Sequence, residues 1–241
     1  MIEIEGLTTS GLQVDRFSLR AGETWCCVGA IGSGMEHFCD IIGGGETSFT
    51  AQRLELPADL GMISFRSQQD LYEEELRRDN TDFLDRLDPG TPARAFLTEI
   101  DHNHHLIELF DLDSHLDKGY RQLSSGQARK LLLLAQLTRG ASLLVMENPF
   151  EGLDQAACAE LDRVLGELPG RGLGLLLFVG NQGDIPAWCT HLAVFRDGAL
   201  VVQGEAAEVR AAAGAALQRP LGLFRVSVEE LRAEQRSLDE G

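Results

Sequence analysis

The hydrophobic positions of the chain form short continuous runs and longer segments with helical spacing, and the two kinds alternate along the sequence. A short apolar run is typical of a buried strand, whereas recurrence every three or four residues is typical of a helix. The expected strands are Val14–Leu19, Thr24–Val28, two short pieces within Thr50–Phe65 of which Leu60–Phe65 is the clearer, Leu143–Met146 and Leu173–Val179. The expected helices are Met35–Ile42, two pieces between Gln68 and Asp113, Gln127–Thr138 and Gln155–Leu168. This alternation predicts an α/β fold with a largely parallel sheet.

Turn and capping residues mark where several of these elements begin and end. Ser124 and Ser125 are expected to cap the helix that follows them, and Gly140 is expected to stop it. The segment Pro89–Pro92 interrupts a helical stretch, so we expect one domain over residues 1–241 with an inserted helical subdomain over about residues 70–138. A hairpin with its turn at Asp197-Gly198 is expected near the C-terminal end, followed by a helical remainder.

The composition is ordinary except for its charge. Of the 241 residues, 44% are hydrophobic and 24% charged, but the formal net charge is −17. A surface this acidic repels phosphate backbones and anionic headgroups, which disfavours nucleic acid as a partner. The charge by itself also suits a soluble cytoplasmic protein.

The cysteines and the apolar runs favour a cytoplasmic protein. The five cysteines are Cys26, Cys27, Cys39, Cys158 and Cys189, and none belongs to a CxxC pair. An odd number without a secretory signal predicts reduced thiols. Because the longest apolar runs are far too short to span a bilayer, any role at a membrane is expected to come through a partner.

Four short motifs follow one another in an informative order. The sequence Leu123–Gln127 reads LSSGQ and lies about 20 residues before an apolar run that ends in Glu147-Asn148-Pro149. Phe150–Asp154 follows directly, and a glycine loop, Gly29–Gly34, stands much earlier between an expected strand and an expected helix. In this order they resemble the signature, Walker B, D-loop and P-loop motifs of ABC-type ATPases. The resemblance covers nearly the whole chain and implies a P-loop NTPase-like domain with N-terminal antiparallel strands.

Within this family, the chain is most similar to one half of the tandem ATPases of the ModF type, which are associated with molybdate transport and are also called photorepair proteins. The segments that carry this narrower similarity are Ile63–Phe65, Asp79–Asp82, Pro149–Asp154 and Gly183–Pro186.

The P-loop motif has lost the residues that bind phosphate and magnesium. Gly29, Gly32, Ser33 and Gly34 keep the glycine frame of the loop. Met35 stands where the family has its lysine, and Glu36 stands where the family has the hydroxyl that binds Mg²⁺. A carboxylate beside the triphosphate would repel it by roughly 4 kcal/mol at about 4 Å and an effective dielectric constant of about 20. The resemblance therefore implies weak or absent ATP binding by this loop.

The hydrolytic positions have changed as well. Glu147 takes the Walker B Asp position, and Asn148 takes the position of the glutamate that activates water. An amide cannot accept a proton from water, so hydrolysis is expected to be lost. Asn181 stands at the position where the family has its switch histidine.

Two further family positions are less clear. The stretch Thr8–Gly11 holds no aromatic ring to stack on adenine, and the Q-loop position falls on Ser67, Gln68 or Gln69, with Gln68 preferred.

The signature and the D-loop remain. In an ABC dimer each nucleotide lies between the P-loop of one subunit and the signature of the other, so Ser124, Ser125, Gly126 and Gln127 would serve a partner's ATP and Mg²⁺, with Asp154 at the same interface. The resemblance implies a non-hydrolysing subunit that pairs with a competent ABC domain, with a membrane permease as a further partner at the inner membrane. A weak self-pairing ATPase and a scaffold that does not use nucleotide are the alternatives.

Several other features are expected to be structural. Met35 and His37 are expected to cover the helix face over the loop, and His102–His105 to form a solvated helix end. We expect Trp25 and Trp188 to pack in the core or in the subdomain and Cys26-Cys27 to be buried. The acidic run Glu73–Glu75 is expected to be solvated, with a coupling role left open.

Overall fold

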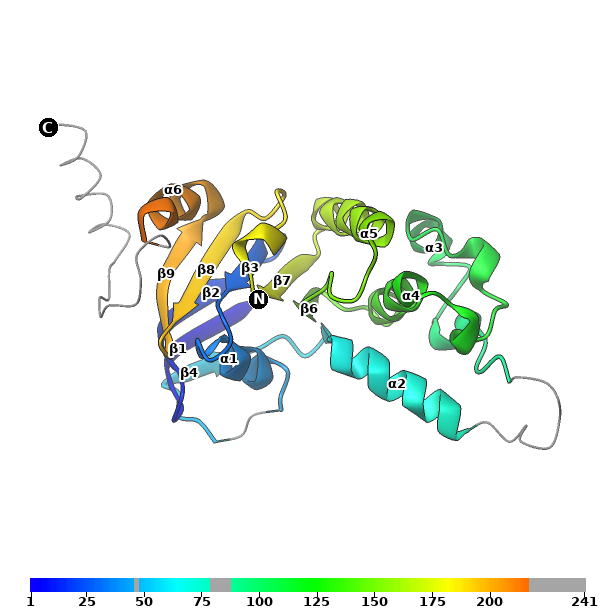
Figure 1. Cartoon of the computed structure of the whole chain (residues 1–241), viewed down its shortest axis with the longest axis horizontal. Helices are drawn as coiled ribbons and strands as arrows, with labels where there is room; N and C mark the ends of the chain where they lie inside the picture. The colour runs from blue at the N-terminus through cyan, green and yellow to red at the C-terminus, as the bar shows by residue number, and fades with distance from the viewer. Residues whose placement is uncertain (46–47, 79–87, 217–241) are drawn as a thin grey trace, which may run out of the picture. The chain divides into compact units, whose positions relative to one another are not determined.

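The computed structural model describes residues 1–45, 48–78 and 88–216 (Figure 1). Contacts within the chain divide it into two compact units, the first made of residues 1–57 with those from 174 onward, and the second of residues 58–173. The expected helical subdomain falls within the second unit. The segment Asp79–Asp82, which carried part of the ModF-type similarity, lies outside the described residues.

The first unit is built on a mixed sheet. Its strands are β1 (Ile2–Thr8), β2 (Gln13–Leu19), β3 (Thr24–Val28), β4 (Arg53–Glu55), β7 (Gly174–Val179), β8 (His191–Arg196) and β9 (Ala199–Glu205). They lie in the order β4-β1-β2-β9-β8-β3-β7. β3 pairs in parallel with β7 and β8, whereas β1 pairs antiparallel with β2 and β4. Every residue of β3 and β7 is buried, as expected for parallel strands covered on both faces.

The expected hairpin is present as β8 and β9. The two strands pair antiparallel, and the turn residues Asp197 and Gly198 have φ values of +49° and +73°. Positive φ at both central residues is the geometry of the tight turn that matches strand twist, and the Asp-Gly sequence favours it. The prediction of the hairpin is confirmed, and its second strand ends at Glu205.

The first unit also contains α1 (Met35–Ile42), α6 (Ala206–Ala216) and the 3₁₀ turn η5 (Gln182–Asp184). Figure 1 shows α6 along β8 and β9. α1 buries Phe38 completely, and its ring lies 5.1 Å from that of Phe17 and 5.2 Å from that of Phe195. Full burial of one such ring contributes about 1.5–3 kcal/mol, so this aromatic cluster holds the helix against the sheet.

The second unit pairs two strands in parallel and is otherwise helical. Its elements are β5 (Leu60–Ile63), β6 (Leu143–Glu147), α2 (Phe65–Arg77), α3 (His104–Leu109), α4 (Ser125–Thr138), α5 (Gln155–Glu167) and the 3₁₀ turns η1 (Ala93–Phe96), η2 (Asp113–His115), η3 (Tyr120–Gln122) and η4 (Pro169–Arg171). β5 and β6 are in register from Leu60 opposite Leu143. The α/β fold class with parallel core strands and antiparallel N-terminal strands is confirmed.

The expectation for the segment after β5 is wrong in one detail. The helix begins at Phe65 and not near Gln68, because Ser64 caps it. The side-chain oxygen of Ser64 accepts a hydrogen bond from the Ser67 backbone nitrogen at 3.0 Å, and the side-chain oxygen of Ser67 accepts one from the Ser64 backbone nitrogen at the same distance. This reciprocal pair satisfies two donors that would otherwise be orphaned at the helix start.

The second expected helical piece is also shorter than the pattern suggested. Between residues 88 and 113 the chain forms η1 and the six-residue α3 in place of one long helix. Glu99 and Asp111 have φ values of +46° and +50°, which a continuing helix does not allow.

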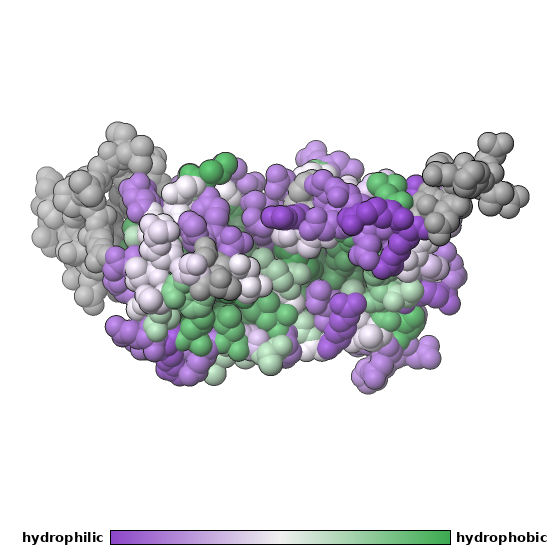
Figure 2. All heavy atoms as spheres, turned by 90° about the horizontal axis from the view of Figure 1, so that it is seen from below, coloured by the Kyte–Doolittle hydropathy of each residue, from purple (hydrophilic) through white to green (hydrophobic). Residues whose placement is uncertain are grey.

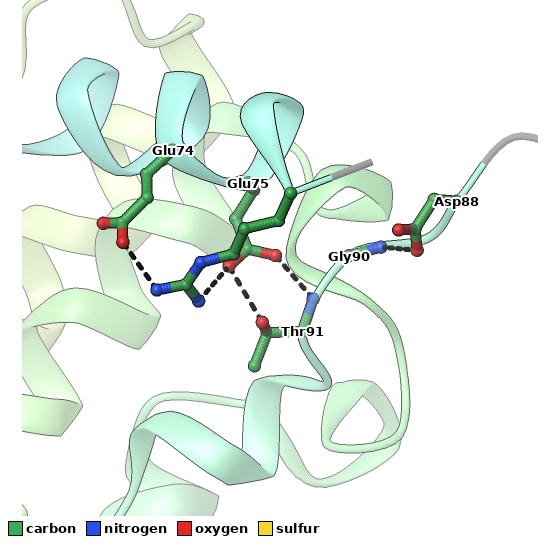
Figure 3. A network of polar contacts seen from close by, with 6 residues as sticks. Glu74, Glu75, Asp88, Gly90 and Thr91 are labelled. Carbon is green, nitrogen blue, oxygen red and sulfur yellow. Dashed lines mark hydrogen bonds and ion pairs between the residues drawn. The ribbon is translucent and has the colours of Figure 1, made fainter. Parts of the chain in front are cut away.

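The acidic run in α2 is not uniformly solvated, contrary to expectation. Glu75 is only 2% exposed, and its carboxylate accepts hydrogen bonds from the backbone and hydroxyl of Thr91 at 2.6 and 2.8 Å (Figure 3). It also lies 3.4 Å from Arg78 Nη1. The neighbouring Glu74 is exposed and pairs with the same arginine. Glu75 is therefore a buried anchor that joins α2 to the loop after Gly90.

The interior predictions for the first unit are confirmed for Trp25, Cys26 and Cys27, which are all buried. The Trp25 ring stacks on His191 with centroids 4.7 Å apart. A hydrogen bond with the Cys189 side chain, followed by burial, raises the pKa of the Cys26 thiol, so this group stays protonated. The five cysteines, all in the described part of the chain, form no disulfide.

The surface carries hydrophilic and hydrophobic side chains. Figure 2 shows one face on which hydrophilic residues surround smaller hydrophobic areas. Among the described residues, the large hydrophobic side chains that are exposed are Met1, Ile31, Tyr72 and Leu76. No helix in residues 1–45, 48–78 and 88–216 has the length and apolar character needed to cross a membrane.

Candidate functional site

The glycine loop after β3 has the backbone that its sequence predicts. Gly32 and Gly34 have φ values of +80° and +90°, which glycine adopts without strain. A side chain at Gly34 would also lie 2.8 Å from the backbone oxygen of Gly11. At Gly29 a side chain would meet the buried hydroxyl of Ser33 at 2.3 Å. Gly32 is therefore required for its backbone conformation, Gly29 for the absence of a side chain, and Gly34 for both reasons.

A pocket of about 480 Å³ opens over this loop within the first unit. It is lined by Val28–Ser33, Gly180–Gln182 and Val194–Asp197. The structure thus brings Asn181 to the same pocket as the glycine loop. Asn181 is exposed, and its Nδ2 donates to Asp184 Oδ2 at 3.2 Å.

The loop's own residues take several of its backbone donors. The backbone nitrogen of Gly32 donates to Oε1 of Glu36 at 2.8 Å. Ser33 donates its backbone N–H to the oxygen of Ala30 at 3.0 Å, and Met35 donates its own to the Ser33 hydroxyl at 3.4 Å. In a loop that binds phosphate, backbone N–H groups point at the ligand. Here three of them are directed to groups of the same loop and of the first turn of α1.

Met35 and His37, both in the first turn of α1, take different positions. Met35 is 7% exposed, so its side chain is part of the core. His37 is half-buried, and its ring would lie 2.7 Å from a side chain at Gly11. The imidazole therefore lies over the stretch in which the sequence lacks an aromatic residue.

The second candidate region is the start of α4 in the second unit. Ser124 is the N-cap, and its hydroxyl accepts from the Gln127 backbone nitrogen at 3.2 Å while Gln127 Oε1 accepts from the Ser124 backbone nitrogen at 3.1 Å. Ser124 and Ser125 are exposed. Gly126 is buried, and a side chain there would lie 3.0 Å from Ala157 Cβ of α5. The glycine thus also permits close packing of the two helices.

Gln68 contacts this same region. Its Nε2 donates to the backbone oxygen of Ser125 at 3.2 Å, and its Oε1 accepts from Nε of Arg129 at 3.0 Å. The other two Q-loop candidates are used locally, since Ser67 caps α2 and Gln69 donates to Glu73 at 3.1 Å. Of the three candidates, Gln68 is the one that contacts α4 through its side chain.

The segment after β6 carries the remaining candidates. Glu147 is half-buried at the end of the strand, and Asn148 has a φ of +43°. Asp154 is the N-cap of α5, where its Oδ1 accepts from the Ala157 backbone nitrogen at 2.8 Å. A local capping role is therefore sufficient to explain this aspartate.

Sequence reasoning missed three side chains that organise the second unit. Arg129 is 3% exposed, and its Nη1 donates to the backbone oxygens of Pro149 and Glu151 at 2.7 and 2.8 Å. Lys130 is 4% exposed and pairs with Glu160 at 2.7 Å. His115 Nε2 lies 2.8 Å from Gln127 Nε2. The sequence feature that could have indicated the buried charges is the pair Arg129-Lys130, which directly precedes the apolar run Leu131–Leu134.

The other groups considered from sequence are structural or peripheral. The cluster His102–His105 spans the start of α3, and His104 lies 3.3 Å from Glu108 and 3.5 Å from Asp113. No group of three or more metal-ligating side chains occurs among the described residues. Trp188 is half-buried, so the expectation that it packs in the interior is met in part.

Comparison with known proteins identifies the family. A scan against models of protein families gives no match. The chain is 30% identical over 210 residues to the ABC transporter ATP-binding protein ModF of Escherichia coli, a match that covers 83% of this chain and 42% of ModF. It is 26% identical over 231 residues to the ribose import ATP-binding protein RbsA of Pseudomonas putida, covering 86% of this chain and 44% of RbsA. The chain thus spans less than half the length of these two relatives.

Solved structures agree with this result at the level of the fold. CbiO1 of Clostridium perfringens, part of the ABC transporter complex cbiONQ, matches with a TM-score of 0.64 and 17% identity over 91% of this chain and 95% of that chain. A nucleotide-free ATP-binding cassette from an ABC transporter matches with a TM-score of 0.61 and 16% identity over 85% of this chain and 90% of that chain. The sequence similarity to ABC transporter ATP-binding proteins supports the ABC-type ATPase nucleotide-binding domain family for this chain, and the solved structures support the fold.

The two side chains that follow Gly34 offer a phosphate group no positive charge. Met35 is buried and neutral, whereas a P-loop motif has a lysine that reaches the phosphates. The carboxylate of Glu36 lies on the amide of Gly32 and places a negative charge among the loop donors. No step of a reaction is therefore assigned to a nucleotide at this loop.

Proposed function

We propose that this ABC domain is a non-hydrolysing subunit that pairs with a competent ABC domain and presents residues 124–127 to the ATP bound by that partner. The observation that carries the proposal is the contrast between the two loops. The donor Gly32 N is directed to the chain's own Glu36, whereas Ser124 and Ser125 stand exposed at the start of α4.

The start of α4 has the properties that a phosphate-facing surface needs. The reciprocal hydrogen bonds of Ser124 and Gln127 hold the first turn of a 14-residue helix. Such a helix end carries a partial positive charge that favours anions. Gln68 supports the same turn from α2 through the backbone oxygen of Ser125.

The hydrolytic residues support the absence of turnover. Asn148 offers an amide where a base is needed, and an amide does not take a proton from water. Asn181 is neutral, and its side chain is bonded to Asp184. We infer that the chain contributes a binding surface and not a reaction centre.

The wider assembly is proposed by analogy with relatives. ModF and RbsA are named as transporter ATP-binding proteins, and cbiO1 belongs to a transporter complex. We propose a membrane permease as a further partner and a cytoplasmic position at the inner membrane through that permease. The narrower link to molybdate rests on the similarity to ModF.

The test measures ATP turnover by the purified chain alone and mixed with a competent ABC domain, the first candidate being one encoded by an adjacent gene. We expect no turnover by the chain alone at any protein concentration, and turnover by the mixture to fall at least about tenfold for Ser124→Arg, because charge and bulk enter the shared site. Gly170→Arg is the matched control, since the same side chain is added at an exposed glycine of the second unit with nothing within 4 Å.

The two alternatives make different predictions in this experiment. Turnover by the chain alone would show a weak ATPase that pairs with itself. Equal turnover for the mixtures with Ser124→Arg and the unaltered chain would show a scaffold whose signature loop is not used. Either result would overturn the proposal.

A further inference from the structure

We propose that Glu36 is a built-in anion of the P-loop, which holds the loop in its folded form without nucleotide and excludes phosphate groups from it. The inference rests on the proposed function, because it concerns the half-site that the chain does not use for hydrolysis. It concerns a defined contact, the 2.8 Å hydrogen bond from the backbone nitrogen of Gly32 to Oε1 of Glu36.

Position explains why this carboxylate can act on the loop. Glu36 is in the first turn of α1, four residues after Gly32, and is half-buried. Gly32 is exposed at the bend of the loop, where its φ of +80° presents the backbone nitrogen toward the helix start. A carboxylate that accepts a backbone N–H forms a charge-assisted hydrogen bond, which is stronger than a neutral one. Negative charge in the first turn of a helix is also favourable.

The neighbouring donors make the loop more self-contained. Ser33 N–H is bonded to Ala30, and Met35 N–H is directed to the Ser33 hydroxyl. Ser33 is 6% exposed, so its hydroxyl is turned inward beneath the loop, close to Gly29. A phosphate group entering the loop would have to displace Glu36 from Gly32 and would meet its negative charge.

The contact has two separable consequences. Removal of the carboxylate should free the Gly32 N–H and lower the repulsion, so that phosphate-bearing ligands bind more tightly. The same change should loosen the loop, because an internal hydrogen bond is lost. Charge repulsion by itself would produce the first effect without the second.

The experiment compares the full-length chain with its Glu36→Ala and Glu36→Gln variants. Binding of Mg·ATP and of inorganic pyrophosphate is measured by calorimetry, and exchange of the Gly32 amide hydrogen is followed by NMR without ligand. For Glu36→Ala we expect binding of both ligands to tighten at least about tenfold and the amide to exchange at least about tenfold faster. For Glu36→Gln we expect tighter binding with a smaller change in exchange, since an amide oxygen still accepts the bond.

Asp40→Asn is the matched control, because it removes one negative charge from an exposed position of the same helix. It should change neither the affinity nor the exchange at Gly32. Equal affinities for the unaltered chain and Glu36→Ala would overturn the inference, as would unchanged exchange in Glu36→Ala or an equal gain in Asp40→Asn. Failure of the proposed function would instead appear as turnover by the unaltered chain, which these measurements do not involve.

Discussion

Nε of Arg129 lies 3.0 Å from Oε1 of Gln68, so a buried guanidinium in α4 holds the side chain that supports the first turn of the same helix from α2. The same arginine donates from Nη1 to the backbone oxygens of Pro149 and Glu151, in the segment after β6. One side chain therefore connects three of the candidate regions of the second unit. Burial lowers the pKa of Arg129 from its ordinary value, but arginine stays charged at neutral pH.

Arg129→Ala should lower the free energy of unfolding by about 3 kcal/mol, because it leaves the buried oxygen of Pro149 and the part-buried oxygens of Gln68 and Glu151 without their donor and opens a cavity. Arg129→Lys should lower the free energy of unfolding by less than Arg129→Ala does, because lysine keeps the charge but cannot reproduce the planar fork of donors. Chemical denaturation measures both. Arg139→Ala, at an exposed position after the same helix, should stay within about 0.5 kcal/mol of the unaltered chain. A similar loss for the two alanine variants would contradict this prediction.

Adjacent glutamates in α2 should differ in their effect on stability. Glu75→Gln should cost about 1–2 kcal/mol, because the buried carboxylate accepts both donors of Thr91 and lies beside Arg78. Glu74→Gln should cost less than about 0.5 kcal/mol, because its pair with Arg78 is exposed. Thermal or chemical denaturation of the two variants side by side checks the difference. Equal losses would mean that burial of Glu75 does not control its contribution.

The conformation of Asn148 predicts an unusual order of substitutions. Its φ of +43° lies in the left-handed region, where asparagine and glycine are tolerated and other residues are strained. Asn148→Ala should therefore cost about 1 kcal/mol in unfolding free energy, whereas Asn148→Gly should be close to neutral. Asn148→Glu should be destabilised like the alanine variant and should not restore ATP turnover while Met35 and Glu36 remain. Turnover by that single variant would show that the P-loop still binds nucleotide productively.

Stability should depend on pH through His115. Burial, followed by repulsion from Lys118, lowers the pKa of this imidazole, so the folded protein prefers its neutral form. The unfolded chain has the ordinary value near 6.5 and binds the proton first as pH falls. Stability should therefore drop as pH falls through about 6.5 toward the folded-state pKa and show no further loss from this group below it.

Unfolding measured at pH 7.5 and 5.5 tests this dependence. His115→Gln should show a smaller loss between the two pH values than the unaltered chain, because it removes the titrating group. His102→Gln, at an exposed position, is the control and should keep the original loss. The prediction is wrong if His115→Gln keeps that loss in full.

Local patterns were sufficient for most of the secondary structure. The continuous apolar runs correctly placed β3, β6 and β7, and the Asp197-Gly198 dipeptide correctly placed the hairpin turn. Expectations failed where a side-chain contact overrode a pattern. The start of α2 depends on the Ser64–Ser67 pair, and the burial of Glu75 depends on a loop about 15 residues away in sequence, whose backbone donor needed an acceptor.

By itself, the sequence predicted the family and the order of its motifs, because these depend on residue type and spacing. The proposed loss of the lysine and of the catalytic glutamate rests on the same spacing. Only the tertiary structure decided what the replacements contact. It placed the Glu36 carboxylate on the Gly32 amide, buried Met35, and joined Gln68 to Ser125 and Arg129 of α4. The physical reason is that a hydrogen bond requires two groups to meet at about 3 Å, and residue spacing does not specify that meeting for side chains that can turn several ways.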